Sequence, residues 1–278
     1  MRFSLVVATV DRTTELARFL AALAAQTHTN FELIVVDQNG DDRLVPVLAP
    51  YVERFALRHL RAPRGLSKAR NVGLRHLCGD IVAFPDDDCW YPPQLLAQVV
   101  SLWQTQRRLG GLTGRSVAPQ GGSSGNARFD PIAGPVTMAN VWRRACSYTM
   151  FFDRKTVETV GDFDETLGLG AGTPWEGGED IDYPVRALKA GLTLYYDPTL
   201  QVQHPNPVPH AERAYRYGAG IGRVWRKHRF PLWYVMYHLL RPLAGSLLHL
   251  SLAQGPRMYY HWCAFRGRVT GWLSRCGS

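Results

Sequence analysis

Short apolar runs alternate with segments of helical spacing along the first hundred residues. Phe3–Thr9 and Phe31–Val36 are rich in β-branched and aromatic residues, which favours strands. Thr13–Ala25, between them, repeats its apolar residues at helical intervals. Further strands are expected at Leu57–Leu60 and, fully buried, at Ile81–Phe84. This alternation predicts an α/β fold with a parallel, doubly wound sheet.

Three consecutive carboxylates, Asp86, Asp87 and Asp88, follow the buried strand. Their mutual repulsion has to be offset, and a divalent cation that prefers oxygen ligands, Mg²⁺ or Mn²⁺, is the usual solution. The alternative is a solvated acidic turn before the helix expected near Pro92–Pro93. Other residues of the sequence are needed to distinguish a cation site from a solvated turn.

Two further carboxylates, Asp11 and Asp37, follow the first and second strands. Ligands bind at the carboxyl ends of strands in open α/β sheets. Unrelated solvated carboxylates would seldom share this placement. We therefore expect a binding site at this edge of the sheet that also includes the three consecutive aspartates.

Loops and shorter elements follow in the order that an α/β chain requires. Helices are expected from Gly65 to Leu77, with Ser67 as the N-terminal cap, and from Leu95 to Leu109. The polar loop 119–126 is either an inert excursion or a lid over a site. Further elements are expected at 112–114, 147–152, 154–160, 179–190, 192–196 and 200–202. The glycine clusters at 168–172 and 218–222 lack the context of a dinucleotide fingerprint.

The C-terminal tail, residues 213–278, differs in composition from residues 1–212. It holds eleven of the 32 Lys and Arg residues and none of the 23 Asp and Glu residues. Phe230–Ala253 is rich in Leu, Trp, Tyr and Met. We expect a helical pair broken at Pro242 that lies on an anionic membrane surface. The alternatives are packing on the preceding domain and a homodimer through the tail. Nucleic acid is not expected as a partner, because no recognition motif accompanies the basic residues.

The cysteines and the N-terminus bear on the compartment. The five cysteines are odd in number and show no CxxC spacing, which disfavours a disulfide framework or a zinc site. The first residues show no signal-peptide pattern. We expect a cytoplasmic protein, peripheral at the inner face of the cell membrane.

The ordered motifs of residues 1–210 resemble family 2 glycosyltransferases of the GT-A fold. The residues that carry the resemblance are Ala8–Arg12, Val35–Asp37, Gly65–Gly73, Asp86–Asp88, and Gly178–Asp182 with Arg186. The resemblance implies a mixed, mostly parallel sheet with helices on both faces, a nucleotide-binding part at about 1–115 and an acceptor part at about 116–212. It also implies transfer of a sugar from a nucleotide-diphosphate donor to an acceptor hydroxyl, with inversion at the anomeric carbon.

The resemblance further implies a donor site and a metal site. The residues expected to bind the nucleotide sugar are Thr9, Asp11, Asp37, Lys68, Arg70, Asp86 and Asp87. Asp87 has the alternative of only bridging solvent. Asp86 and Asp88 correspond to the metal-binding DXD pair, with Mn²⁺ or Mg²⁺ as the cofactor and His204 as a third ligand. The alternative for His204 is a structural histidine at a strand end, with its hydrogen bonds made to other residues rather than to a metal.

On the acceptor side, Asp180 corresponds to the general base that deprotonates the acceptor hydroxyl. Trp175 is expected to stack on a sugar face or, alternatively, to pack. Glu179 is expected near the acceptor, and crowding with Asp182 at the helix start would raise one pKa. Asp182 has the alternative role of complementing the helix dipole.

The sequence departs from the family pattern at two positions after the first strand. Val10 stands where an aromatic is frequent and Asp11 where asparagine is frequent. Because a QxxRW signature is absent, we expect one sugar per encounter rather than processive synthesis. A sugar-phosphate nucleotidyltransferase would need a glycine-rich loop after the first strand, which Thr9–Arg12 lacks. A non-catalytic membrane-attached scaffold is the other alternative. Membrane contact would suit a lipid-linked acceptor or polysaccharide biosynthesis.

Overall fold

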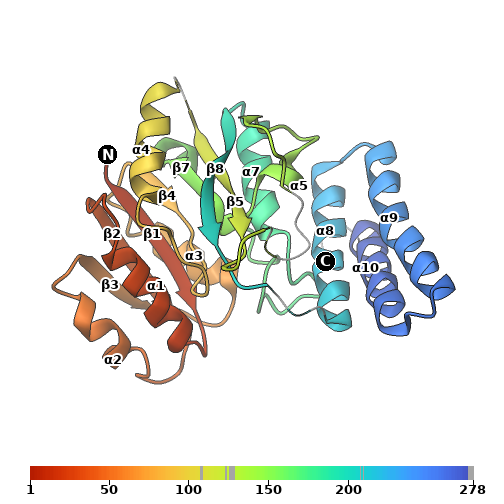
Figure 1. Ribbon diagram of the computed structural model, residues 1–278, viewed down its shortest axis with the longest axis horizontal. Helices are drawn as coiled ribbons and strands as arrows, with labels where there is room; N and C mark the ends of the chain where they lie inside the picture. The colour runs from red at the N-terminus through yellow and green to blue at the C-terminus, as the bar shows by residue number, and fades with distance from the viewer. Residues whose placement is uncertain (107–108, 123, 125–128, 207, 209, 275–278) are drawn as a thin grey trace. The chain divides into compact units, whose positions relative to one another are not determined.

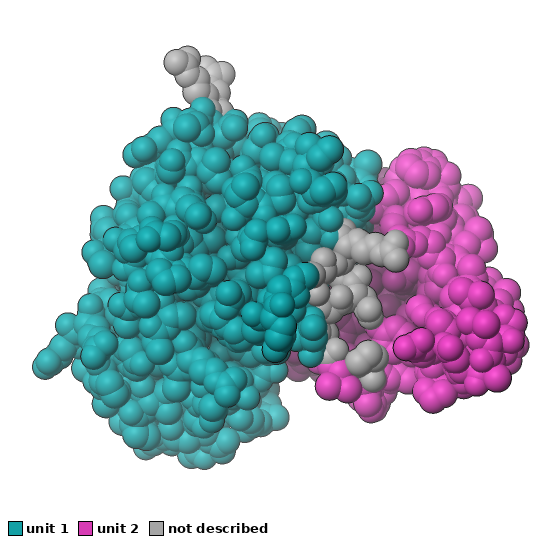
Figure 2. Space-filling view, in the orientation of Figure 1, with its two compact units in different colours: residues 1–64, 68–163, 183–207 teal, residues 65–67, 164–182, 208–278 magenta. Residues whose placement is uncertain are grey.

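A computed structural model describes residues 1–106, 109–122, 124, 129–206, 208 and 210–274 of this chain (Figure 1). The chain divides into two compact units, coloured separately in Figure 2. Unit 1 comprises Met1–Arg64, Lys68–Phe163 and Tyr183–Pro207, and unit 2 comprises Gly65–Ser67, Asp164–Asp182 and Val208–Ser278.

Unit 1 is built on a sheet whose strand order is β3-β2-β1-β4-β7-β5-β8-β6 in the described residues. The four strands from β3 to β4 are parallel to one another, and β5 is parallel to β8. β7 is antiparallel to β4 and β5, and β6 is antiparallel to β8. The expected mixed, mostly parallel sheet is confirmed. The strands are β1 Phe3–Thr9, β2 Phe31–Asp37, β3 Ala56–Arg61, β4 Ile81–Ala83, β5 Gly111–Val117, β6 Gly134–Pro135, β7 Met150–Asp153 and β8 Leu194–Gln203.

Helices cover both faces of this sheet, as expected. On one face, apolar side chains of α1 (Thr14–Ala24) and α4 (Leu95–Thr105) join those of β1 and β2 in a buried core cluster. On the other face, Gly73 of α3 (Leu66–Leu74) lies so close to Val6 that a Cβ would clash with it. Tyr183 of α7 (Glu179–Lys189) packs on Phe152 and Phe163 on that face.

The remaining helices of unit 1 are short. They are α2 Val45–Leu48, α5 Val141–Arg144, α6 Arg154–Val160 and the 3₁₀ turns η1 Ala49–Tyr51 and η2 Ser147–Thr149. The two strands expected at 192–196 and 200–202 form the single strand β8. The expected end of α4 near Leu109 was wrong, because the helix ends at Thr105 and Gln106 is extended. The loop 119–126, predicted as either an inert excursion or a lid, includes residues outside the described ranges.

Ser67 is not the cap that the sequence predicts for α3. It lies inside the first turn of this helix, and its hydroxyl donates to the carbonyl of Leu167 at 2.7 Å. A serine inside a helix satisfies its hydroxyl wherever an acceptor is near, and the acceptor here comes from a distant part of the chain. The prediction was wrong because sequence spacing does not show that acceptor.

The tail is helical, as expected, but its break lies elsewhere. α9 (Leu232–Ser251) runs without interruption through Pro242, between α8 (Ala211–His228) and α10 (Gly255–Leu273). Pro242 has no N–H for the carbonyl of His238, one turn earlier, and Arg268 Nη1 donates to that carbonyl instead at 2.6 Å. The chain turns after α9 at Ala253, whose φ is 54°. The predicted break at Pro242 was therefore wrong.

Glycines bring α8 and α10 into backbone contact. A Cβ on Gly218 or Gly222 would clash with the backbone of α10, and one on Gly267 or Gly271 would clash with the backbone of α8. The two glycines on each helix are separated by three residues, the spacing that lets helices approach closely. The cluster at 218–222 thus serves helix packing rather than dinucleotide binding.

α9 carries a row of exposed large apolar side chains. They are Leu232, Trp233, Met236, Tyr237, Leu240, Leu247, Leu248 and Leu250. Among the described residues, no helix has both the length and the apolar character to cross a membrane.

Candidate functional site

Asp86, Asp88 and His204 form a cluster at the carboxyl ends of β4 and β8. One ligand atom from each residue lies within 4.8 Å of the others. His204 Nε2 is 3.2 Å from Asp88 Oδ1. Two carboxylates and one imidazole are a donor set that Mn²⁺ accepts readily and Mg²⁺ also tolerates. The residues therefore fit the divalent metal site expected from the sequence.

Backbone pairing holds these two strand ends together although they are far apart in the sequence. The His204 N–H donates to the carbonyl of Val117 at the end of β5, at 3.0 Å. Trp90, shortly after the aspartates, pairs with Gln203 through both backbone groups. The loop after β4 is thus fixed to β8 directly before His204.

Arg70 holds Asp86 from beneath. Its guanidinium is 1% exposed and donates from Nη2 to Asp86 Oδ1 at 3.0 Å and to Ser147 Oγ at 3.1 Å. The same guanidinium lies over the ring of Phe163, 5.3 Å from its centre. Arg70, expected near the nucleotide, is therefore a buried cation that orients a carboxylate of the cluster.

Arg12 spans the other two aspartates. Its Nη1 lies 2.6 Å from Asp87 Oδ1 and 2.6 Å from Asp88 Oδ2. Burial opposes the charge of Arg12, yet the two carboxylates raise its pKa. Burial raises the pKa of Asp87 to about 6 against the opposing effect of Arg12. Asp87 is buried against Arg12, so it does not bridge solvent as the alternative had it.

Tyr148 and Pro205 fix the ring of His204. The two rings of Tyr148 and His204 stack with centres 4.8 Å apart, and the Tyr148 hydroxyl donates to Ser116 Oγ at 2.9 Å. His204 Nδ1 lies 2.6 Å from the carbonyl of Pro205, which can only accept, so Nδ1 is the donor and Nε2 faces Asp88.

Asp88 and His204 shift one another's protonation. Burial acts to lower the pKa of His204, but the hydrogen bond and charge of Asp88 raise it above its usual value. Burial acts to raise the pKa of Asp88, but His204 and Arg12 lower it below its usual value. Both groups are therefore stabilised in their charged forms where they meet.

Asp37 is fully buried at the end of β2. Its Oδ1 accepts from the backbone N–H and the side-chain amide of Asn39, at 2.8 and 2.7 Å. Its Oδ2 lies 2.9 Å from both His59 Nε2 and Arg61 Nη1. Asp37 thus anchors the start of the loop after β2.

Asp11 is exposed at the end of the loop after β1. Its φ of 56° is left-handed, a conformation that aspartate tolerates better than most residues. Its N–H donates to Asn39 Oδ1 at 2.8 Å, and its carboxylate meets Arg43 at 3.0 Å and Arg64 at 2.6 Å. Asn39 therefore links Asp37 to the Asp11 backbone.

Thr9 and Lys68 complete the expected donor residues. Thr9 is buried at the end of β1, in register with Asp37. Lys68 is partly buried on α3, two residues before Arg70. Unit 1 thus contains all the residues that the sequence assigns to the nucleotide sugar and the metal.

The residues assigned to the acceptor belong to unit 2. Asp180 is half-buried in the first turn of α7, next to the buried Glu179. Asp182 is buried and lies 2.6 Å from Lys227 Nζ and 2.8 Å from His228 Nε2 of α8. Asp182 therefore has the cation of Lys227 and the imidazole of His228 as specific partners in addition to the helix dipole.

Trp175 is 6% exposed, with the guanidinium of Arg223 4.3 Å from the centre of its ring. Trp175 therefore packs inside unit 2, as the alternative predicted. A stacking role toward a sugar stays a prediction.

Sequence reasoning gave no role to three residues of the site: Arg12, Asn39 and Tyr148. Arg12 and Asn39 directly follow the ends of β1 and β2, where functional side chains of this sheet gather, and that position was a usable signal. Tyr148 had none, because its contact with His204 depends on the pairing of β7 with β5.

Comparison with known proteins is consistent with this geometry. The family profile described as glycosyl transferase family 2 matches residues 4–153, more than half of the chain. The glycosyltransferase AglE of Haloferax volcanii is 26% identical over 255 residues, which cover 88% of this chain and 81% of AglE. The uncharacterized glycosyltransferase YwdF of Bacillus subtilis is 34% identical over 94 residues, which cover 34% of this chain and 35% of YwdF.

Two solved structures share the fold. The mannosyltransferase PcManGT from Pyrobaculum calidifontis, in complex with GDP-Man and Mn²⁺, has a TM-score of 0.71 at 18% identity; the match covers 98% of this chain and 87% of that one. S. aureus TarS 1-349, in complex with UDP-GlcNAc, has a TM-score of 0.64 at 17% identity; the match covers 81% of this chain and 65% of that one.

Proposed function

Because this chain belongs to glycosyl transferase family 2 and is a glycosyltransferase of the GT-A fold, we propose that it moves one sugar per encounter from a nucleotide-diphosphate sugar to an acceptor hydroxyl, in a metal-dependent, inverting reaction. The cluster of Asp86, Asp88 and His204 carries this proposal. The cation pairs of Arg12 and Arg70 with these aspartates support it.

The donor would lie along the carboxyl ends of β1, β2 and β4. Thr9, Asp11 and Asp37 would hold the nucleoside, and Lys68 would approach the diphosphate. The proteins with this fold that were solved with GDP-Man and UDP-GlcNAc support a nucleotide-diphosphate sugar as the donor class.

Asp86, Asp88 and His204 would hold Mn²⁺ or Mg²⁺. When bound, such an ion neutralises the charge that grows on a diphosphate leaving group. Arg70 keeps Asp86 in place and adds a buried positive charge beneath it. Arg12 holds the second oxygen of Asp88, so the rotamer of that carboxylate is set by a residue of this chain.

Asp180 would be the general base. Inversion needs a base on the face of the sugar opposite the leaving group. Of the two aspartates in the first turn of α7, Asp182 is buried beside Lys227, whereas Asp180 is half-buried. Glu179 and Trp175 would contact the acceptor.

The tail would place the enzyme on the inner face of the cell membrane. The exposed apolar row of α9 and the excess of basic residues in 213–278 support an amphipathic, anionic-lipid-binding surface. A lipid-linked or polysaccharide-related acceptor would follow from that location.

Vesicles test the membrane part of this proposal. The full chain should co-sediment with vesicles of phosphatidylglycerol, and the double variant Trp233→Glu, Leu240→Glu should lose this binding. Equal sedimentation of both proteins would remove α9 as the membrane surface. A mass that doubles with concentration in light scattering, and halves in the double variant, would assign the apolar row to a homodimer instead.

Released nucleoside diphosphate tests the transfer itself. We would incubate the full chain with a panel of sugar nucleotides and Mn²⁺, and expect release from one donor. The release should vanish with EDTA and with Asp88→Asn, and return on adding Mn²⁺ only to the wild type. Proton NMR of the product should show the anomeric configuration opposite to that of the donor. Retained configuration would exclude inversion, and full activity in EDTA would exclude the metal.

A further inference from the structure

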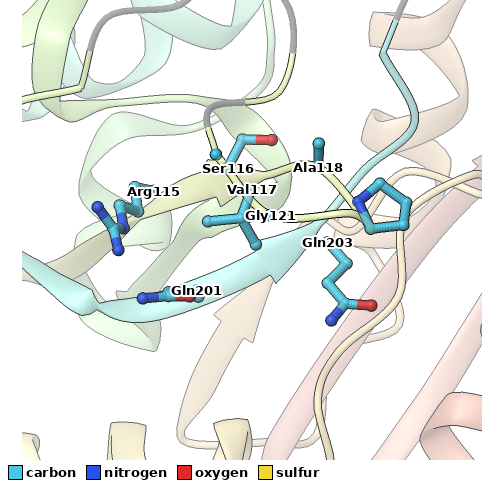
Figure 3. A pocket seen from close by; sticks show the side chains of 9 residues that line it. Arg115, Ser116, Val117, Ala118, Gly121, Gln201 and Gln203 are labelled. Atoms are coloured by element: carbon cyan, nitrogen blue, oxygen red, sulfur yellow. The ribbon is translucent and has the colours of Figure 1, made fainter.

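A polar pocket of about 310 Å³ lies along the carboxyl-terminal halves of β5 and β8 in unit 1. Figure 3 shows that Arg115 enters it from β5, and Gln201 and Gln203 from β8. These three side chains offer N–H donors. None of the described residues that line the pocket is Asp or Glu.

Strand register places these donors on one face of the sheet. Arg115 is paired with Gln201, and Val117 with Gln203, so all four side chains share a face. Ser116 and Val202, which alternate with them, are buried on the opposite face. The donors therefore form one wall rather than a scattered set.

The pairing of β5 with β8 is irregular directly before Arg115, and the extra residues belong to β8: Thr113 pairs with Tyr196, and Arg115 pairs with Gln201. The register between β5 and β8 shifts between Thr113 and Arg115. Gly114, at this shift, lies so close to the Leu200 backbone that a Cβ would clash with it. Bulges re-aim side chains of the strand that carries the extra residues, and the side chain that follows them here is Gln201 of β8.

Arg115 has an unsatisfied hydrogen-bond donor. Its Nε is buried and has no hydrogen-bond partner among the described residues. A buried guanidinium nitrogen without an acceptor is costly, and the oxygens of a carboxylate or a phosphate satisfy it best. The amide of Gln201, which Figure 3 shows on the same side as Arg115, could donate to a remaining oxygen.

The pocket adjoins the metal cluster on the side away from the expected nucleoside residues. Gln203 directly precedes His204, and Val117 accepts the His204 N–H. Thr9 and Asp37 lie on β1 and β2, which the strand order places beyond β4 and β7 from β5. A group bound at Arg115 would thus lie on the side of the cluster opposite Thr9 and Asp37.

We propose that this pocket binds an oxyanion of the acceptor, a phosphate or a carboxylate, and so selects acidic acceptors. This proposal rests on the proposed sugar transfer. It adds to that function a class of acceptor, and it names Arg115 as the residue that would bind the anionic group of that acceptor.

Binding of small probes to the full chain tests the pocket without turnover. We would titrate sn-glycerol 3-phosphate, glucuronate and neutral glycerol by calorimetry. One of the two anions should bind and glycerol should not, and the anion that binds identifies phosphate or carboxylate as the group. Arg115→Gln should weaken anion binding about tenfold or more, the scale of a lost charged hydrogen bond. The exposed Arg18 provides the control Arg18→Gln, with the same charge change and unchanged binding.

A second variant covers the case in which Arg115→Gln fails to fold. Gln201→Glu places a carboxylate opposite Arg115, where it would pair with the guanidinium and repel the probe. It should abolish anion binding while the protein keeps its circular dichroism spectrum. Anion binding that is equal in wild type, Arg115→Gln and Gln201→Glu would overturn the proposal.

Binding of UDP and GDP with Mn²⁺ separates the acceptor from the donor as the source of the oxyanion. Arg115→Gln should leave the affinity for the nucleotide that binds unchanged, and that nucleotide should not displace the anion probe. A parallel loss of nucleotide affinity would assign the pocket to the donor diphosphate and overturn the proposal. Absence of diphosphate release from every donor would instead sink the transfer proposal and leave the anion titration as it was.

Discussion

Nη1 of Arg12 lies 2.6 Å from Oδ2 of Asp88, which joins the loop after β1 to the loop after β4. The same nitrogen meets Asp87, whose pKa burial raises to about 6. One half-buried arginine therefore balances two carboxylates at a site that also fits a cation.

Arg12→Gln should lower the melting temperature, because it leaves the buried carboxylate of Asp87 without its cation at a cost of about 1–3 kcal/mol. Mn²⁺ should stabilise this variant more than the wild type, since the ion restores positive charge beside Asp88. Thermal unfolding with and without Mn²⁺ measures both effects, with Arg18→Gln as the control. An equal Mn²⁺ shift in both proteins would show that Arg12 does not share the site with the ion.

Asp180→Asn and Asp182→Asn form a matched pair on the same helical turn. Asp180→Asn should abolish transfer and keep the melting temperature and nucleotide affinity of the wild type, because a base is needed only for the chemical step. Nucleoside diphosphate release and calorimetry measure the two. Wild-type transfer rates in Asp180→Asn would remove this residue as the base.

Asp182→Asn should instead destabilise unit 2. Asp182 is buried between Lys227 and His228, and breaking a buried ion pair costs about 3–5 kcal/mol. Denaturant unfolding should show a lower midpoint. A stability within 0.5 kcal/mol of wild type, the range of ordinary surface substitutions, would mean that the pair contributes nothing.

Gly222→Ala and Gly271→Ala should each destabilise the helical tail, because the added methyl meets the backbone of the facing helix. Overpacking of this kind costs about 1–3 kcal/mol. Gly255→Ala is the control in the first turn of α10. Open space surrounds Gly255, so alanine there should raise the free energy of unfolding by about 0.5–1 kcal/mol. In thermal unfolding, the melting temperature should fall for Gly222→Ala and Gly271→Ala and rise for Gly255→Ala. The packing argument fails if all three variants shift in the same direction.

His238 should make the tail sensitive to acid. Burial, together with Arg268 on α10 and Arg241 on α9, lowers the pKa of His238 to about 4. The unfolded chain binds this proton near the usual pKa of 6.5, so the free energy of unfolding should fall between pH 6.5 and 4 and level off below. The rings of Trp225 and Tyr234 also pack on His238.

His238→Gln removes that titration. Denaturant unfolding of wild type and variant at pH 7 and pH 4.5 measures the difference between the two curves. The variant should lose less stability on acidification than the wild type. Parallel losses would show that other groups cause the acid sensitivity.

The sequence predicts the fold well wherever a signal is local. β1 begins and ends where its apolar run does, because nearly all of that run is buried. α6 also spans the predicted residues Arg154–Val160. Asp86 and Asp88 are also local, because they follow a short buried strand. The metal site as a whole depends on contacts distant in sequence: His204 reaches Asp88 because Trp90, in the loop after β4, pairs with Gln203 at the end of β8.

Two of the errors have one physical cause. Pro242 and Ser67 both suggest a helix boundary when only near neighbours are considered. In each case a group distant in sequence supplies the missing hydrogen-bond partner. Arg268 donates to the carbonyl that has no N–H donor at Pro242, and the carbonyl of Leu167 accepts from the Ser67 hydroxyl. The partners of Arg12 are likewise distant in sequence, since Asp87 and Asp88 lie near the end of β1 because β4 pairs with β1.

The paired glycines of α8 and α10 offer a way to recognise this tail in other chains. Apolar composition drifts easily among Leu, Met, Tyr and Trp, whereas backbone contact tolerates no side chain at either member of a pair. A search for two small-residue pairs of this spacing, on two helices separated by an apolar one, would find such tails where overall similarity has faded. In this chain, Gly218, Gly222, Gly267 and Gly271 are the residues through which the sequence sets that backbone contact.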